Sequence, residues 1–537
     1  MTFFSFFFNT FQPRVNNKAN KRFWLPGVLQ GIDNPDTTVG GKLLPLKGQE
    51  WGLGTIKGDT GQTITLAILA AASPLEEPAM VAPCNPNDLD DDNNYATLSM
   101  NDGDILGLDN IFVYPEPSIH ESAEGYNFTV ELKFDAYDEL AKLGIKGNYQ
   151  LEQKIAIINA GETSIKTIVG TGTFSSEITN AKLQADIQIG IVGNGSNRKS
   201  DLTITQLRLV SAVEGGTPVF ATKVLTINAE PGFEDIWLNI SNSALNSPEA
   251  SASMLQSLIT TLNEPSNLQS LSQTVNQQLD DALNSLLGKA EQLPAQSNET
   301  LSNAADLYVF DRFRAAINDP NSNLYLPKQL QSISSPKIEP LTIDQIDIGE
   351  QKVAGLPWQP NILTQVRITG LANNLATEDN IHLKESLLTM LASQGALVTS
   401  SDRMVDGKEI PAPPLKIYAD FSLSPPGGIT PVTGTLTASI SNSQFEILAT
   451  AAGPMLDELV ITLQGMALKV DLKAIAIDLN ITSDSMMNSM ANGLVNRDSV
   501  KQELVVQLNA QISNNLTSIS QQVSESVVKY GTDALDN

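Results

Sequence analysis

The side chains that most often carry out chemistry in proteins are sparse in this chain. It has two histidines, His120 and His382, and one cysteine, Cys84. A Ser-His-Asp triad or a histidine-built metal site needs several such groups close together, so neither is expected. Both histidines are interpreted as surface or packing residues, and one cysteine excludes an intrachain disulfide. We therefore expect a protein that is not an enzyme, with no catalytic residue, metal or cofactor.

Three polar motifs approach a known binding pattern and then depart from it. Gly193 to Ser200 resembles a phosphate-binding loop, but Arg198 stands where the second glycine is needed. Trp51-Gly52-Leu53-Gly54 begins like a dinucleotide fingerprint, yet the next glycine comes one residue late. The acidic run from Asp88 to Asp92 lacks the central glycine and terminal glutamate of an EF-hand. We interpret the first and last motifs as loops.

Length and charge limit the remaining function classes. The 537 residues are enough for two or three domains, and 60 acidic against 33 basic residues give a net charge of −27. Binding to nucleic acid or simple adsorption to anionic lipid is therefore not expected. The Phe-rich start, Phe3 to Phe11, lacks the basic region and cleavage site of a signal peptide, and no stretch is long enough to span a bilayer. We expect a soluble chain that is cytoplasmic or released by a non-classical route.

Alternating apolar residues predict antiparallel strands from Ile105 onward. Phe128, Val130, Leu132 and Phe134 alternate with polar residues, which is the pattern of a half-buried strand. Similar runs follow to Ile227, with Gly and Asn clusters between them, and a second series runs from Lys416 to Leu479. Each series is followed by a long amphipathic helix.

The two helices share one apolar pattern at an offset of 233 residues. The first stripe has steps of 4, 4, 4 and 3, and the second repeats them. The residues are Leu271, Val275, Leu279, Leu283 and Leu286, then Leu504, Leu508, Ile512, Leu516 and Ile519. Upstream, Gly172 to Asn180 resembles Gly434 to Asn442, and Leu238-Asn239-Ile240-Ser241 resembles Leu479-Asn480-Ile481-Thr482. The chain is therefore interpreted as two copies of one domain.

This order predicts an α+β fold with two tandem copies of a curved antiparallel sheet wrapped around a long C-terminal amphipathic helix, plus an irregular N-terminal region. The expected boundaries are 1–104 for an N-terminal arm and small β-rich or irregular region, and 105–293 for the first domain. A linker with one helix follows at 294–345, and the second domain occupies 346–537.

The order of these elements resembles the tubular lipid-binding (TULIP) superfamily. The resemblance rests on the repeated strand starts at Gly172 and Gly434, the Leu-Asn-Ile-Ser/Thr segments, and the helices at 267–293 and 499–529. The resemblance covers about 105–293 and 362–530. The Asn/Ser-rich helices, with no signal peptide and no cysteine pair, are closest in style to the bacterial OrfX-type proteins of toxin gene clusters. The resemblance implies binding of a lipid or hydrophobic small molecule.

If the helix and sheet do not fill the space between them, an apolar groove remains for an elongated ligand. The candidate lining residues are Leu271, Val275, Leu279, Leu283, Leu504, Leu508, Ile512 and Leu516. The alternative is a structural or interaction protein, such as a toxin-complex component or extracellular scaffold, with both cores fully packed. Its protein partners or self-assembly would depend on the N-terminal arm, and removal of residues 1 to 22 would then abolish assembly.

Overall fold

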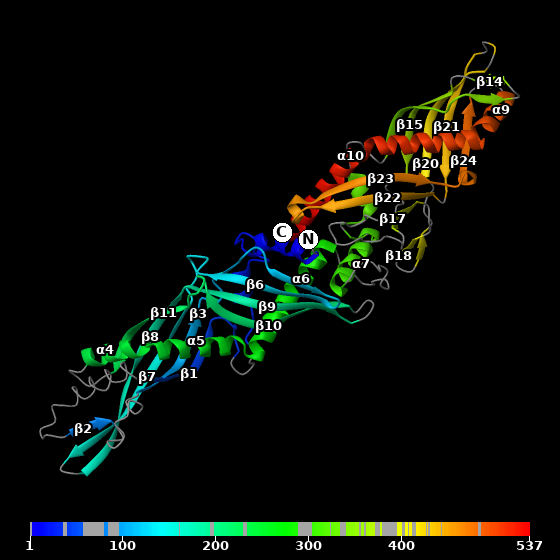
Figure 1. Cartoon of the computed structure of the whole chain (residues 1–537). Coiled ribbons are helices and arrows are strands. Elements are labelled where there is room, and N and C mark those ends of the chain that lie inside the picture. The colour runs from blue at the N-terminus through cyan, green and yellow to red at the C-terminus, as the bar shows by residue number, and fades with distance from the viewer. Residues whose placement is uncertain are drawn as a thin grey trace.

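The computed structural model of the chain is elongated, with sheets and helices at each end and both termini near the middle (Figure 1). It describes residues 3–35, 40–56, 80–83, 96–159, 162–193, 198–228, 234–287, 303–319, 321–322, 324–332, 340–353, 356–358, 361–370, 376–377, 395–399, 403–405, 408–410, 415–425, 427, 430–441, 443–481 and 485–536. The predicted α+β fold with tandem antiparallel sheets and a long C-terminal helix is confirmed.

The strands of the first copy form two antiparallel sheets. The larger has the order β1-β3-β7-β8-β11, with β2 beside β7. Its strands are β1 (Leu46–Ile56), β2 (Met80–Pro83), β3 (Ala96–Leu106), β7 (Gly144–Asn159), β8 (Glu162–Thr179) and β11 (Val219–Asn228). The smaller has the order β10-β9-β6-β4, with β5 beside β6. Its strands are β4 (Ile111–Val113), β5 (Ser118–Ser122), β6 (Gly125–Phe134), β9 (Ala181–Val192) and β10 (Lys199–Ser211).

The second copy repeats this arrangement with shorter strands. One sheet has the order β12-β15-β20-β21-β24, formed by β12 (Leu341–Asp347), β15 (Asn361–Thr369), β20 (Leu415–Leu423), β21 (Val432–Ile440) and β24 (Ile475–Ile481). The other has the order β16-β17-β22-β23, formed by β16 (Ala376–Thr377), β17 (Gly395–Thr399), β22 (Ser443–Ala452) and β23 (Val460–Lys469). Two short hairpins complete it, β13 (Gln351–Val353) with β14 (Leu356–Trp358), and β18 (Arg403–Val405) with β19 (Lys408–Ile410).

Helices follow the strands in both copies. The first copy has α4 (Glu234–Leu245), α5 (Pro248–Leu262) and α6 (Pro265–Leu287), and the second has α9 (Ser485–Val495) and α10 (Asp498–Asp536). The predicted helices at 267–293 and 499–529 correspond to α6 and α10. The helix expected in the linker is α7 (Ala304–Asn318), which α8 (Leu326–Ser332) follows. Pro248 and Pro265 begin α5 and α6, where a missing N–H leaves no helical hydrogen bond unmade.

The N-terminal residues have more regular structure than their sequence predicts. The expected irregular arm forms α1 (Phe3–Val15) and α2 (Leu25–Gln30). Strand β1 lies in the region that was expected to be β-rich or irregular. Both β1 and β3 pair into the larger sheet of the first copy, so this sheet includes strands from before residue 105.

The repeated glycines occupy equivalent places. Gly172 in β8 lies opposite Tyr149, and Gly434 in β21 lies opposite Phe421. A Cβ atom on either glycine would come within 3.0 Å of that aromatic ring and closer still to a backbone oxygen of the neighbouring strand. Both positions therefore need glycine so that an aromatic ring can pack across the sheet.

The second repeated segment does not correspond. Leu238 to Ser241 lies within α4, whereas Leu479 to Ile481 is strand β24. In β24 both Leu479 and Ile481 are buried, while in α4 Ile240 is buried and Leu238 is exposed. Four residues are too few to separate a period of 2 from one of 3.6, which explains the wrong match.

Polar side chains of the helices close the edges of the sheets. Edge strand β10 donates its backbone N–H groups to Asn263, Ser272 and Asn276, from Leu207, Ile204 and Leu202 respectively. Edge strand β23 donates in the same way to Asn509, Ser520 and Ser524, from Leu468, Leu463 and Ile461. The helix thus satisfies hydrogen-bonding groups that another strand would otherwise pair with.

Candidate functional site

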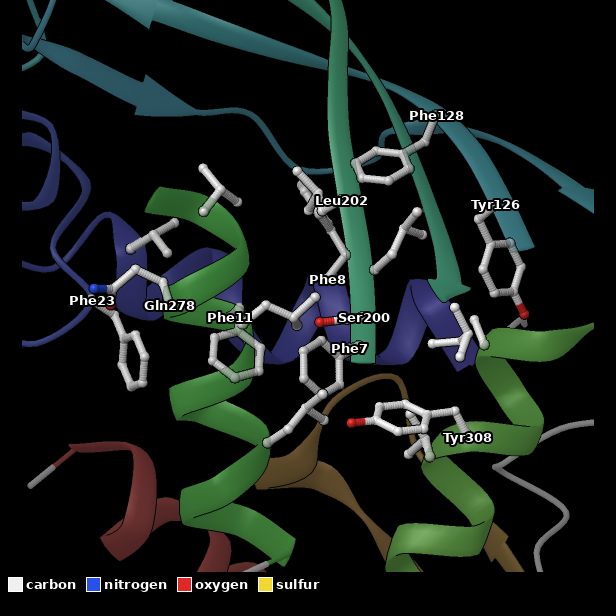
Figure 2. Close-up of a pocket in the computed structure, with 18 of the residues that line it drawn as sticks. Phe7, Phe8, Phe11, Phe23, Tyr126, Phe128, Ser200, Leu202, Gln278 and Tyr308 are labelled. Atoms are coloured by element: carbon white, nitrogen blue, oxygen red, sulfur yellow. The ribbon is translucent and has the colours of Figure 1, made fainter. Parts of the chain in front are cut away.

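Two adjoining apolar cavities lie in the first copy, between α1, α6 and the smaller sheet. Their volumes are about 200 and about 270 Å³. They share lining residues, including Phe8, Phe11, Phe128 and Val275. Figure 2 shows the first of them, with α1 behind, α6 to one side and α7 to the other. Together the cavities extend from Tyr308 on α7 to Leu46 on β1.

The N-terminal helix α1 forms one wall of both cavities. Phe8, Phe11 and Val15 line both, because residues three and four apart share one face of a helix. Phe11 also packs edge-to-face against Phe23, with ring centroids 5.5 Å apart. The sequence analysis missed this wall, although the spacing of the phenylalanines carried its signal.

The opposite wall is α6, where the four residues predicted from the first stripe come together. Leu271 and Val275 line the larger cavity, and Val275, Leu279 and Leu283 line the smaller. They follow one another at four-residue steps on one helix face. Their contact with a ligand stays a prediction.

The four residues predicted in the second copy occupy a different setting. Leu504, Leu508 and Ile512 are buried in the core of that copy, against the sheet that contains β20, β21 and β24, and Leu516 is half-buried. Residues of α6 and α10 that are 233 positions apart therefore do not occupy equivalent places in the two copies. Ser272 and Ser520 make equivalent bonds to edge strands at an offset of 248.

The corrected offset explains the difference in setting. At an offset of 248, Leu504 and Leu508 correspond to positions 256 and 260 of α5 and not to α6 (504 − 248 = 256, 508 − 248 = 260). Helix α5 is itself packed into the core of the first copy through Met254 and Leu258. Steps of 4, 4, 4 and 3 occur on any amphipathic helix, so the stripe alone did not fix the register. A groove of about 530 Å³ lies beside α10 in the second copy, but Asp457, Glu458 and Glu525 contribute charged groups to it.

Among the residues that the structure describes, none that lines the two apolar cavities has a charged side chain, and most of the polar lining groups bond to the protein. Tyr126 donates its hydroxyl to Asp306, with an O–O distance of 2.8 Å, and Ser200 donates to Asp280 at 2.7 Å. The side-chain amides of Gln12 and Asn267 donate to backbone carbonyls at 3.0 and 2.8 Å. These groups are therefore not available to hold a charged ligand.

A buried carboxyl lies behind this lining. Asp306, at the start of α7, accepts hydrogen bonds from Tyr126 and from the side chain of Asn303, which also donates to Glu121 on β5. Burial raises the pKa of Asp306 to about 6. Burial, and then the charge of Asp306, raises the pKa of Tyr126. The network joins α7 to β5 and β6, and so supports one end of the cavity.

The other sequence candidates lie apart from this site. His120 is exposed on β5, whereas His382, Cys84 and Asp88 to Asp92 lie outside the described residues. Trp51 to Gly54 is part of β1, and 194–197 of the loop-like motif are not described, although Arg198 pairs with buried Asp311 at 2.9 Å. Across the described ranges, no group of three or more His, Cys, Asp or Glu side chains is placed to hold a metal ion.

No helix among the described residues has the length and apolar character needed to cross a membrane. No family model matches the chain, and no curated protein matches its sequence.

Solved structures similar to this chain include the crystal structure of lipopolysaccharide binding protein, at 9% identity, with 87% of this chain and 92% of that chain covered and a TM-score of 0.23. Another is Takeout 1 of Epiphyas postvittana, at 12% identity, with 39% and 82% covered and a TM-score of 0.19. Because the identities and TM-scores are this low, neither similarity says what this chain binds.

Proposed function

We propose that this chain is a non-enzymatic binding protein that holds a lipid or another elongated apolar molecule in the cavities of its first copy. The observation that carries the proposal is the pair of adjoining cavities between α1, α6 and the smaller sheet, where the described lining residues include no charged side chain. Apolar walls favour a ligand that removes apolar surface from water.

The size of the cavities supports binding. Protein interiors are packed with few voids larger than a water molecule, and an apolar cavity of roughly 150 Å³ stays dry and binds small apolar ligands. Each cavity here is larger, at about 200 and about 270 Å³. Because Phe8, Phe11 and Val275 line both cavities, an elongated molecule that displaces these side chains can occupy both.

The two copies are proposed to have different roles. In the first copy the apolar stripe of α6 lines the two cavities. Its residues are Leu271, Val275, Leu279 and Leu283. In the second, Leu504, Leu508 and Ile512 are packed in the core, which gives that copy a mainly structural role. We also propose, from the duplicated arrangement of sheets and helices, that the chain is a tandem member of the tubular lipid-binding superfamily. Its assignment to the bacterial, toxin-cluster branch stays a prediction.

The alternative, an interaction protein that docks partners through its N-terminal arm, has less support. Phe6 and Phe23 of that arm are buried, and Phe7, Phe8 and Phe11 line the cavity or contact one another. A partner would have to displace these contacts before it could bind the same side chains.

The test is native mass spectrometry of the full chain, followed by analysis of an organic extract. We expect a bound mass of lipid size in the wild type. Leu279→Gln places a polar group on the cavity wall and should reduce that mass fraction severalfold, because an unpaired buried amide is costly. Val506→Gln, at a side chain that is 51% exposed on α10, is the control. Ligand-free wild type that also takes up no added lipid would refute the proposal.

A further inference from the structure

The two apolar cavities share side chains from each of their walls. The shared residues include Phe8 and Phe11 of α1, Phe128 of β6, Leu202 of β10 and Val275 of α6. These five residues, here called the apolar ring, lie where the cavities adjoin. On one side of the ring the smaller cavity continues to α7, and on the other the larger cavity continues to β1. A chain that is too long for one cavity must therefore pass through the ring.

The volumes of the cavities indicate how long a chain each can hold. An apolar cavity of roughly 150 Å³ binds benzene, so each carbon atom of an apolar ligand needs roughly 25 Å³. The smaller cavity, of about 200 Å³, then holds about 8 carbons. The larger, of about 270 Å³, holds about 11 carbons. A longer chain is buried completely only if the side chains of the ring move aside.

Aromatic contacts hold the Phe11 ring in place. It lies next to Phe7 and Phe23, with ring centroids 4.5 and 5.5 Å away, and Phe23 is buried (Figure 2). Such aromatic pairs add to the stabilisation that comes from burial alone. A ligand that moves Phe11 must therefore disturb a packed aromatic cluster.

The second copy holds the helix that carries two members of the apolar ring. Arg14 of α1 donates to Asp457 and Asp536 of the second copy, at 3.1 and 2.9 Å. The hydroxyl of Thr10 accepts from the backbone N–H of Leu456 at 3.0 Å. Hydrogen bonds between charged groups are stronger than those between neutral groups, so these contacts oppose any movement of α1 away from the cavities.

We propose that the apolar ring, through Phe11 in particular, limits the apolar chain that the first copy binds to a medium length of about 8 to 11 carbons. This inference rests on the proposed function and adds the length of the ligand. It assigns Phe11 as a residue that determines specificity. The second copy contributes to that specificity, because it keeps α1 in place.

The experiment measures the affinity of the full-length protein for straight-chain primary alcohols from hexanol to tetradecanol. After delipidation, each alcohol displaces an apolar fluorescent dye from wild type, Phe11→Ala and Phe112→Ala. Alanine removes the aromatic ring from α1 and is a strong helix former. Phe112→Ala is the matched control. Its neighbours on β4, Ile111 and Val113, line the larger cavity, whereas Phe112 points to the other face of the strand.

In wild type we expect the affinity to rise about fourfold with each added carbon, because one more methylene is buried, and to level off near undecanol. Phe11→Ala should extend this rise to tetradecanol and bind that alcohol roughly tenfold or more tightly than wild type does. Phe112→Ala should level off where wild type does. A wild-type affinity that rises up to tetradecanol, or a Phe11→Ala affinity that levels off at the wild-type length, would overturn the inference while leaving ligand binding intact.

A second variant covers the case in which Phe11→Ala does not fold, as judged by circular dichroism. Val275→Ala widens the same ring from α6 and should extend the rise in the same way. Levelling off at the wild-type length in that variant would also overturn the inference. If no alcohol displaces the dye from wild type, the proposed function fails together with the inference.

Discussion

Asn246, directly after α4, and Asn496, directly after α9, hold equivalent edge strands by the same pair of hydrogen bonds. Asn246 accepts from the backbone N–H of Thr222 on β11 and donates to its carbonyl, at 3.1 and 2.9 Å. Asn496 does the same to Ile477 on β24, at 3.2 and 2.6 Å. An asparagine thus replaces the backbone of a further strand, and the internal repeat extends to side-chain function.

Removal of the asparagine side chain that bonds to the edge strand, here called the asparagine clamp, should weaken the junction of α4 with its sheet. We expect Asn246→Ala to lower the free energy of unfolding by about 1 kcal/mol, since its two exposed hydrogen bonds to Thr222 and a third to the carbonyl of Asn242 are lost. Asn239→Ala, at an exposed position within α4, is the control for the loss of an asparagine side chain that does not hold the strand. Denaturant titration measures both, and equal stabilities of the two variants would contradict the role of the clamp.

A larger side chain at the boundary of the two cavities should block binding. Val275 lines both, so Val275→Phe is expected to fill the space where they adjoin and to reduce affinity for an apolar dye at least tenfold. Val506→Phe makes the same change at an exposed site on α10. Dye titration of both variants is the measurement, and undiminished binding by Val275→Phe would place the ligand elsewhere.

The docking of α1 should depend on Arg14. This buried side chain donates to Asp536 and Asp457, at 2.9 and 3.1 Å, and to the carbonyl of Thr10. Arg14→Met should destabilise the docked helix by about 2 kcal/mol, because hydrogen bonds to charged groups are lost. Hydrogen exchange of α1 amides should then accelerate severalfold. The exposed pair of Lys18 with Glu139 contributes less, so Lys18→Met should leave that exchange nearly unchanged.

The free energy of unfolding should depend on pH through the titration of Asp306. Burial raises the pKa of this carboxyl from 3.8 to about 6 in the folded state. The folded state therefore binds more protons between these values, and this contribution to stability is full below pH 4 and is lost as pH rises through 6.

Asp306→Asn should flatten the corresponding part of the stability curve, whose slope reaches at most about 1.4 kcal/mol per pH unit. Chemical denaturation from pH 4 to pH 8 measures the slope, with the exposed Asp235→Asn as control. Identical slopes in wild type and Asp306→Asn would show that the carboxyl does not titrate in this range.

Local patterns predicted the elements of this fold well. The alternation of Phe128, Val130, Leu132 and Phe134 marks β6, and all four side chains are buried. The four-residue steps from Leu271 to Leu283 mark the face of α6 that lines the cavities. Such local patterns can be predicted because the side-chain direction of a strand or helix repeats every few residues.

The sequence by itself thus determined the two-copy organisation and the helices and strands that follow residue 105. Only the tertiary structure decided that α1 forms the opposite wall and that Leu504 and Leu508 lie in a filled core. Two helices with the same apolar period can face open space or a packed sheet, because the difference lies in contacts between residues far apart in the chain.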